Sequence, residues 1–217
     1  MAFKRNMNAT EMVAFINNEL LPQTKLEIGN WIKPRKRQGG YFVTVRQIFC
    51  MVDFLGAVFS GYHLAERKKD KKGQQIATSH KAIKFVTTFF SPKSEYSFNT
   101  VTKLYDMYRN GLVHLYQPKI LKLNSNSRLQ WFFYKGNRHK DKIKVDSDKG
   151  KITFRNINHL QIVSNDPNKK KFYLPVSIDC LYSDFEAAVQ EYRDRLNKTK
   201  YLQRNWRTAV NAVCKPR

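Results

Sequence analysis

The sequence predicts an α+β fold: a mainly helical bundle that carries a small antiparallel β insertion before its C-terminal helices. Two observations predict it. Apolar residues recur at helical spacing through most of the first 116 residues and again over residues 176–197. Between these regions, short runs rich in β-branched and aromatic residues alternate with turn-like segments such as NSNS and SDKG, as strands and their turns do.

Each element has its own sequence signal. Thr10 is a plausible N-cap for the first helix, Ser79 for a third, and Pro92 and Pro118 end the third and fourth. The expected helices cover residues 10–32, 41–67, 79–91, 96–116, 176–197 and 201–213. The expected strands lie in KILKLN, RLQWFFYKG, KIKVD and KITFRNINHLQIV. The chain therefore divides into a helical part (1–118), a β-rich insertion (119–174) and closing helices (175–217), together forming one structural domain.

Composition indicates a folded protein that attracts polyanions. The 217 residues carry a formal net charge of +23, and 41% of them are hydrophobic. A disordered basic tail lacks that apolar content, and so large an excess of Lys and Arg on a folded body draws nucleic acid to it. An anionic membrane is a weaker alternative, because no basic amphipathic anchor or lipidation motif stands out.

The sequence favours a cytoplasmic protein. Its N-terminus lacks the apolar run and cleavage site of a secretory signal, and no stretch approaches the roughly 20 apolar residues of a membrane span. Cys50, Cys180 and Cys214 are too widely spaced for a disulfide framework or a zinc pattern. No histidine has a partner at metal-ligand spacing, so we expect neither a metal nor another cofactor.

The segment with the clearest chemical potential is LYDMYRNGLVHLYQPK, residues 104–119. On a helix, Asn110 and His114 share one face, and Arg109 is close enough to reach the same pocket. Histidine exchanges protons near neutral pH, and arginine matches phosphate oxygens with a planar set of donors. The alternative is structural: Asn-Gly often ends a helix, and Arg109 and His114 would then be a surface charge and a core histidine.

Arg109-Asn110-Gly111-Leu112-Val113-His114 resembles the R-N-x-x-x-H motif of HEPN domains, and the surrounding tyrosines and HLYQPK are similar to bacterial members. The resemblance covers residues 8–118 and the helix over 176–197, and leaves 119–174 unexplained. It implies a HEPN-like helical bundle, a homodimer with a composite site, and metal-independent RNA cleavage to 2′,3′-cyclic phosphate and 5′-hydroxyl ends. His114 would act as base or acid, Arg109 would steady the phosphorane, and Asn110 would orient the histidine or the phosphate. It also implies a role as a toxin or antiviral-defence effector, with an unknown inhibitor or activator as a further partner.

Two more residues are candidates for support of this site. Asp53 interrupts an apolar helix and could orient His114 or Arg109, although a lone acid there is more often a structural hydrogen-bonding group. Tyr108 directly precedes the motif.

Four basic runs predict a shared phosphate-binding face. Their candidate RNA-binding residues are Lys33, Arg35, Lys36, Arg37, Arg67, Lys68, Lys69, Lys135, Arg138, Lys140, Lys169, Lys170 and Lys171. Trp131, Phe132, Phe133 and Tyr134 lie between two of the runs and offer a stacking surface for unpaired bases, although strand alternation turns only half of them outward. Three functions thus stay open: a ribonuclease, a non-catalytic RNA-binding protein, and a DNA-binding or architectural protein.

Overall fold

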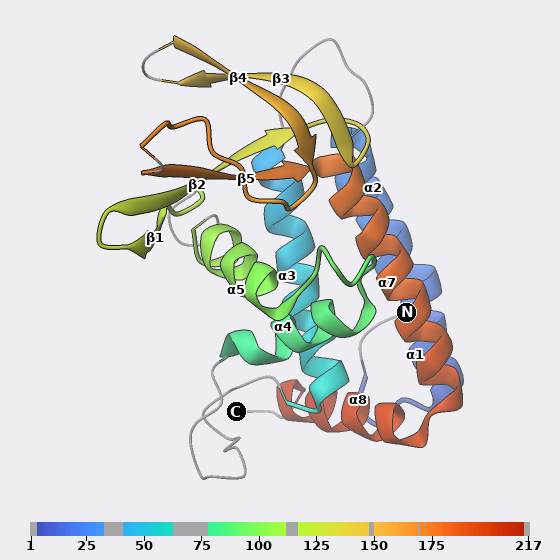
Figure 1. The fold of residues 1–217 in the computed structure, drawn as a ribbon. Helices are drawn as coiled ribbons and strands as arrows, with labels where there is room; N and C mark the ends of the chain where they lie inside the picture. The colour runs from blue at the N-terminus through green and yellow to red at the C-terminus, as the bar shows by residue number, and fades with distance from the viewer. Residues whose placement is uncertain are drawn as a thin grey trace.

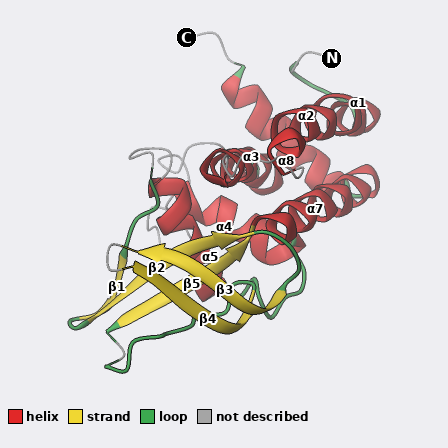
Figure 2. Ribbon diagram, turned by 90° about the horizontal axis from the view of Figure 1, so that it is seen from above, coloured by secondary structure: helices red, strands yellow, loops and turns green. Residues whose placement is uncertain are grey.

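The protein has a mixed α/β fold in which the strands gather at one end of a helical body. The computed structural model describes residues 4–32, 41–62, 78–111, 117–147, 150–168 and 170–214. In Figure 1 the strands lie above the helices, near the start of the central helix. Seen from above, in Figure 2, the strands and most of the helices occupy opposite sides of the molecule.

The first helical segment begins one residue earlier than the sequence predicts, and its N-cap is a different residue. Helix α1, Ala9–Phe15, is capped by Asn8, whose side chain accepts a hydrogen bond from the Glu11 backbone N–H while the Glu11 carboxylate accepts one from the Asn8 N–H, each at 2.9 Å. This reciprocal box satisfies two amides at once, so Thr10 lies inside the helix and the prediction that it is the N-cap is wrong. A π-helical turn, η1 (Ile16–Leu20), leads into α2 (Leu21–Ile32).

Helix α3, Tyr41–Ser60, is the central helix of the body, and half of its twenty residues are buried. It ends at Ser60, because Gly61 adopts a φ of +79° that breaks the helical path, so the expected continuation through residues 61–62 is wrong. Among the described residues it alone is long and apolar enough to cross a membrane, which corrects the expectation that no stretch approaches a span. Its burial against other helices is what the core helix of a soluble protein shows.

Helix α4, Thr78–Phe89, packs closely against α3. A Cβ atom at Gly56 would lie 2.7 Å from the backbone carbonyl of Lys81, so glycine permits this approach. Ser79 lies inside α4 and does not cap it, which corrects that prediction. Helix α5, Phe98–Leu104, begins after the Ser97 cap and continues into a π-helical turn, η3 (Tyr105–Asn110), where an uninterrupted α-helix was expected.

The strands form two small sheets. Strands β1 (Leu121–Asn124), β2 (Ser127–Tyr134) and β5 (Lys171–Ser177) form one, and β3 (His139–Ser147) pairs with β4 (Gly150–Asn158) in the other. The pairs β1–β2 and β3–β4 are antiparallel, as predicted. The pair β2–β5 is parallel, so the prediction of a wholly antiparallel insertion is wrong. After the β3–β4 hairpin, the following loop brings the chain back to the end of the sheet where β2 begins, so β5 runs parallel to β2.

Strand β5 includes the first two residues, 176 and 177, of the expected C-terminal helix. Ser177 caps α7, Ile178–Lys198, with its side chain accepting from the Cys180 backbone N–H, so Val176 belongs to a strand. The segment Leu174-Pro175-Val176 is apolar enough to fit either period, and pairing with β2 decides for the strand. The last helix, α8 (Lys200–Val213), begins one residue before its predicted start and ends where predicted.

The two faces of β2 enter two different apolar cores. Trp131 and Phe133 pack against the large helical core, whereas Phe132 and Tyr134 belong to a second cluster under the β3–β4 ribbon. This alternation matches the expectation that only half of the aromatic run shares one face. The β2–β5 sheet is therefore sandwiched between the helices and the ribbon.

Candidate functional site

Arg109 is held by a carboxylate from the central helix. It lies in the π-helical turn η3, and its Nε donates to Asp53 Oδ2 of α3 at 2.7 Å. Tyr105 donates its hydroxyl to the other oxygen, Asp53 Oδ1, at 2.6 Å. The Arg109 side chain is 24% exposed and that of Asp53 16%, so the pair lies at the boundary of core and solvent. Two residues that the sequence proposed for one site are thus in direct contact.

The chain returns to this turn from its far side. The Lys119 backbone N–H donates to the Met107 carbonyl at 2.9 Å, and Trp131 Nε1 of β2 donates to the Pro118 carbonyl at 3.3 Å. A Cβ atom at Gly111 would lie 2.6 Å from the Gln117 carbonyl oxygen and from the Lys119 nitrogen. Gly111 is therefore required by a close approach of backbone, and its helical φ of −71° shows that Asn110-Gly111 is not a left-handed helix end.

Asn110 and Tyr108, beside Arg109 in the chain, have different environments in the structure. Asn110 Nδ2 donates to Asp106 Oδ1 at 3.1 Å, so its amide is oriented along the same turn. Tyr108 is fully buried, its ring stacks on Phe49 with centroids 6.3 Å apart, and burial raises its pKa well above the ordinary value. Its position in the core gives it a packing role. His114 lies outside the described residues, so its predicted role stays a prediction.

Two further basic residues, Lys81 and Arg46, lie close enough to this site to act on its charged groups, and no sequence pattern indicates them. Lys81 on α4 is 6% exposed; burial lowers its pKa, the charge of Asp53 raises it and that of Arg109 lowers it further. Burial also raises the pKa of the Cys50 thiol, while Arg109 and Arg46 lower it. Arg109 and Lys81 thus both lie within electrostatic range of Asp53, so two cations share this carboxylate. No periodicity or motif could have brought Lys81 here, because its place depends on how α4 packs on α3.

The predicted basic residues fall into several groups. Lys33, Arg35, Lys36, Arg37, Arg67, Lys68, Lys69 and Lys169 lie outside the described residues. Lys135 places its Nζ 5.7 Å from the centroid of the Tyr41 ring at the start of α3. Lys140 reaches back over Gly136, and the backbone amides of Lys170 and Lys171 donate to Asp166 at 3.1 Å.

The β3–β4 ribbon carries a basic face that extends the predicted basic run KGNRHKDKIK (135–144) to the neighbouring strand β4. Its inward residues, among them Ile143 and Val145, pack on the second core. The pairing register places the intervening positions of both strands on the opposite face, and these are exposed: Lys142, Lys144, Lys151 and Arg155, with Asp146 as the acid among them.

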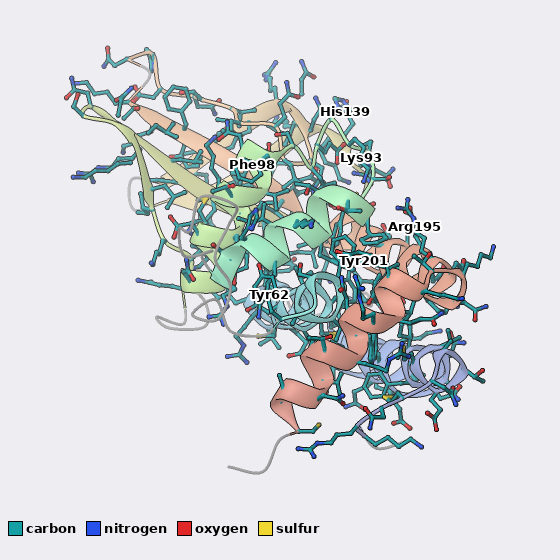
Figure 3. The ribbon with its side chains drawn as sticks, turned by 90° about the horizontal axis from the view of Figure 1, so that it is seen from below. Tyr62, Lys93, Phe98, His139, Arg195 and Tyr201 are labelled. Carbon is teal, nitrogen blue, oxygen red and sulfur yellow. The ribbon has the colours of Figure 1, made fainter. Side chains whose placement is uncertain are left out.

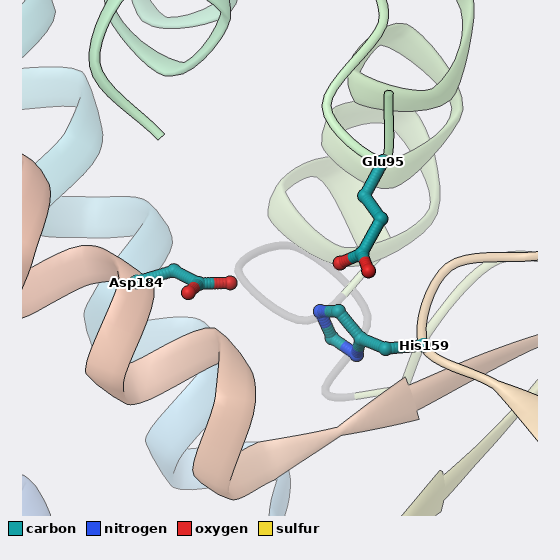
Figure 4. A group of neighbouring side chains, drawn as sticks. All are labelled: Glu95, His159 and Asp184. Atoms are coloured by element: carbon teal, nitrogen blue, oxygen red, sulfur yellow. The ribbon is translucent and has the colours of Figure 1, made fainter. Parts of the chain in front are cut away.

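Arg138 belongs to a second, different cluster, in which Glu95, His159 and Asp184 converge (Figure 4). Its guanidinium bridges Glu95 and Asp184 and donates to the Ser91 carbonyl at 3.2 Å. The bridge joins the turn before α5 to the β2–β3 turn and to α7. Arg138 is thus engaged in a structural bridge between two carboxylates, and its role in RNA binding stays a prediction.

The hydrogen bonds fix the protonation of His159. Its Nδ1 accepts the Ser177 backbone N–H at 2.9 Å, so its Nε2 carries the proton and faces the Tyr96 hydroxyl at 3.3 Å. Tyr96 in turn donates to Asp184 Oδ2 at 2.6 Å. Burial and, secondarily, Arg138 lower the pKa of His159 to about 3, so the imidazole is neutral.

Glu95, His159 and Asp184 offer three ligand atoms within 4.8 Å of one another, a proximity that the sequence did not predict. A metal ion would have to displace the bonds that these groups already make. Both oxygens of Asp184 accept hydrogen bonds, Glu95 faces Arg138, and both nitrogens of His159 are engaged. The guanidinium already supplies the positive charge between the two acids, so the donor set does not fit a metal.

Comparison with protein-family models, with curated proteins and with solved structures found no match to this chain.

Proposed function

We propose that this protein is an RNA-binding protein of the cytoplasm that cleaves RNA at the Arg109 site, in the manner of a HEPN-type ribonuclease. The observation that carries the proposal is the Arg109–Asp53 ion pair, set in a π-helical turn with a second cation, Lys81, nearby. A fixed guanidinium in a positive environment suits the charge that grows on phosphate oxygens during transfer. π-helical turns are uncommon and are frequent at functional sites.

The reaction follows from the chemistry of these side chains. His114 removes the proton from a ribose 2′-hydroxyl, whose oxygen attacks the adjacent phosphorus. The new 2′-oxygen–phosphorus bond forms as the bond to the 5′-oxygen breaks, and the leaving oxygen takes a proton from a second acid. Arg109 stabilises the phosphorane, and Asn110, held by Asp106, orients the phosphate or the histidine. In a HEPN-like homodimer, which we also propose, the His114 of a second copy supplies that acid.

Cleavage assays in EDTA test the enzymatic claim. We expect wild type to cut end-labelled single-stranded RNA to cyclic-phosphate ends and to spare DNA, which lacks the 2′-hydroxyl. His114→Ala should be slower by about a hundredfold, as befits the loss of acid–base catalysis. Arg109→Lys keeps the charge next to Asp53 but loses the planar fork, so it should also slow cleavage while preserving binding. Intact RNA in every wild-type reaction, with varied substrates including total tRNA, would refute the nuclease claim.

A second candidate function, RNA binding without cleavage, is favoured by a separate observation. The outward face of the β3–β4 ribbon presents Lys142, Lys144, Lys151 and Arg155 to solvent. Neutralising two of them, as in Lys142→Gln with Lys144→Gln, should weaken RNA binding and reduce its salt dependence by about two phosphate contacts. If this variant binds less RNA and wild type never cleaves, binding alone is the function.

A further inference from the structure

We infer that the aromatic pocket between α3 and β2 binds an unpaired nucleobase of single-stranded RNA; this inference rests on the RNA binding proposed above. The pocket has a volume of about 530 Å³, within the range of small-molecule sites. Its walls come from the first turn of α3, from β2 and from the end of β3; its residues are Tyr41, Phe42, Val43, Trp131, Phe132, Phe133, Val145 and Asp146.

Three rings form the stacking surface. Phe42 meets Trp131 and Phe133 edge to face, with centroids 5.3 Å and 5.6 Å apart, and the latter two are 5.4 Å from one another. Phe42 is 40% exposed, a large value for an aromatic residue at the mouth of a hollow. Nucleobases stack on such rings because every base has a π-face, which makes aromatic walls a recurring feature of single-strand binding sites.

The charges around the pocket favour a nucleic acid over an apolar peptide. Lys135 lies over Tyr41 at one side of the pocket. The wall formed by β3 ends at Asp146, the one charged residue among those that line the pocket. This wall belongs to the ribbon whose outer face is basic, and the chain as a whole has a net charge of +23. A base that enters the aromatic pocket would therefore have its flanking phosphates among cations, and the amide end of α3 adds a partial positive charge.

The pocket is structurally continuous with the Arg109 turn. Phe133 packs on Tyr108, with centroids 5.3 Å apart, and Tyr108 directly precedes Arg109. The Trp131 indole N–H donates a hydrogen bond to the Pro118 carbonyl. The next residue, Lys119, donates its backbone N–H to the carbonyl of Met107 in the same turn. The two sites thus share β2 and η3 as a common support, so a base held in the pocket would fix the register of a strand that also reaches Arg109.

The test uses a short RNA that cannot be cleaved. We would place 2-aminopurine, whose fluorescence is quenched by stacking, within an oligouridine carrying 2′-O-methyl groups, and titrate it with the full-length protein. Binding of the single strand to wild type should quench the 2-aminopurine fluorescence. Binding of the same oligomer as a duplex should cause no further quenching. Phe42→Ala should weaken single-strand binding by about tenfold to a hundredfold and abolish the quenching, whereas duplex binding stays the same.

Two further variants separate stacking from folding. Phe42→Leu keeps an apolar side chain in place and should show the same loss of quenching with an unchanged melting temperature. Phe98→Ala removes a phenylalanine that is 63% exposed at the start of α5 (Figure 3), outside the pocket, and should bind as wild type does.

The outcomes distinguish this inference from the proposed function. Binding without quenching, or a Phe42→Leu variant within twofold of wild type, overturns the base pocket and leaves RNA binding standing. If the protein quenches the 2′-O-methyl oligomer but does not cleave the same sequence with free 2′-hydroxyls, the base pocket is supported and the nuclease claim is refuted. No binding of any RNA overturns both.

Discussion

Two arginines on this chain are each held by carboxylates, yet the two sites have opposite charge balances. Arg138 bridges Glu95 and Asp184, so two acids surround one cation. Arg109 faces Asp53, and the charge of Asp53 also acts on Lys81, so two cations share one acid. The first arrangement neutralises its arginine within the fold, whereas the second leaves an excess of positive charge beside Asp53, where we propose that phosphate binds. A charged residue is therefore better judged by the balance of its surroundings than by membership of a basic run.

The largest effect of this difference should appear in stability. Arg138→Met leaves Asp184, which is buried, and Glu95 without their cation, and burial already raises the pKa of both acids. We expect a loss of about 3 kcal/mol, the low end for a broken buried ion pair, because Arg138 itself is 35% exposed. Urea denaturation measures it. Arg155→Met, at an exposed position on β4, is the matched control and should change stability by less than about 0.5 kcal/mol. Equal effects would show that the bridge contributes nothing particular.

The Arg109 site should respond in activity more than in binding. Asp53→Asn removes the charge that holds Arg109 while keeping the size of the side chain, and it also makes the site more positive. We expect cleavage to slow by about tenfold at saturating RNA, with RNA affinity unchanged or higher, because a mispositioned guanidinium still attracts phosphate. Asp194→Asn, an exposed acid on α7, is the control. A fall in affinity with an unchanged maximal rate would contradict the positioning role.

His159, in the cluster around Arg138, should also make the stability of the fold depend on pH. The pKa of His159 is about 3 in the folded protein and near 6.5 in an unfolded chain, so between these values the unfolded state binds the additional proton. The free energy of unfolding is then fully retained above pH 6.5 and falls as pH is lowered, by at most about 1.4 kcal/mol per unit.

Measurements between pH 7.5 and 5.5 are the most informative, because the raised pKa values of Glu95 and Asp184 act with the opposite sign at lower pH. His159→Gln, which cannot titrate, should give a flatter profile, even if its stability is lower throughout. Parallel profiles for wild type and His159→Gln would show that this imidazole does not remain neutral in the folded protein.

The smallest expected effect concerns base preference in the aromatic pocket. Asp146 lines the pocket and is the acid on an otherwise cationic ribbon face. A carboxylate accepts hydrogen bonds from the amino groups of cytosine, adenine and guanine, whereas uracil has no amino group. Asp146→Asn should therefore narrow the difference in affinity between oligocytidine and oligouridine by a few-fold, as measured by fluorescence anisotropy. If the variant merely binds both oligomers more tightly by one factor, the acid acts through its charge and does not read the base.

The sequence by itself determined the element types and much of their order, because helical and strand periodicities are local properties. It predicted α7 and α8, the strands in the insertion, and the alternation of Trp131 and Phe133 with Phe132 and Tyr134. It also selected Asp53 and Arg109 as members of one site. Among the predictions that failed were helix boundaries such as Thr10, where the nearby Asn8 caps the helix in its place, and Ser79.

Tertiary structure decided what depends on pairing between distant segments. The parallel register of β2 with β5 made a strand of residues that also fit a helix, and the return of the chain over Gly111 fixed the turn that carries Arg109. The charge balance of each arginine was decided in the same way. The packing of α4 on α3 brings Lys81 within electrostatic range of Asp53, and Glu95 and Asp184 meet at Arg138 from separate elements. A sequence specifies the charges themselves, but only the packed fold sets the distances over which they act.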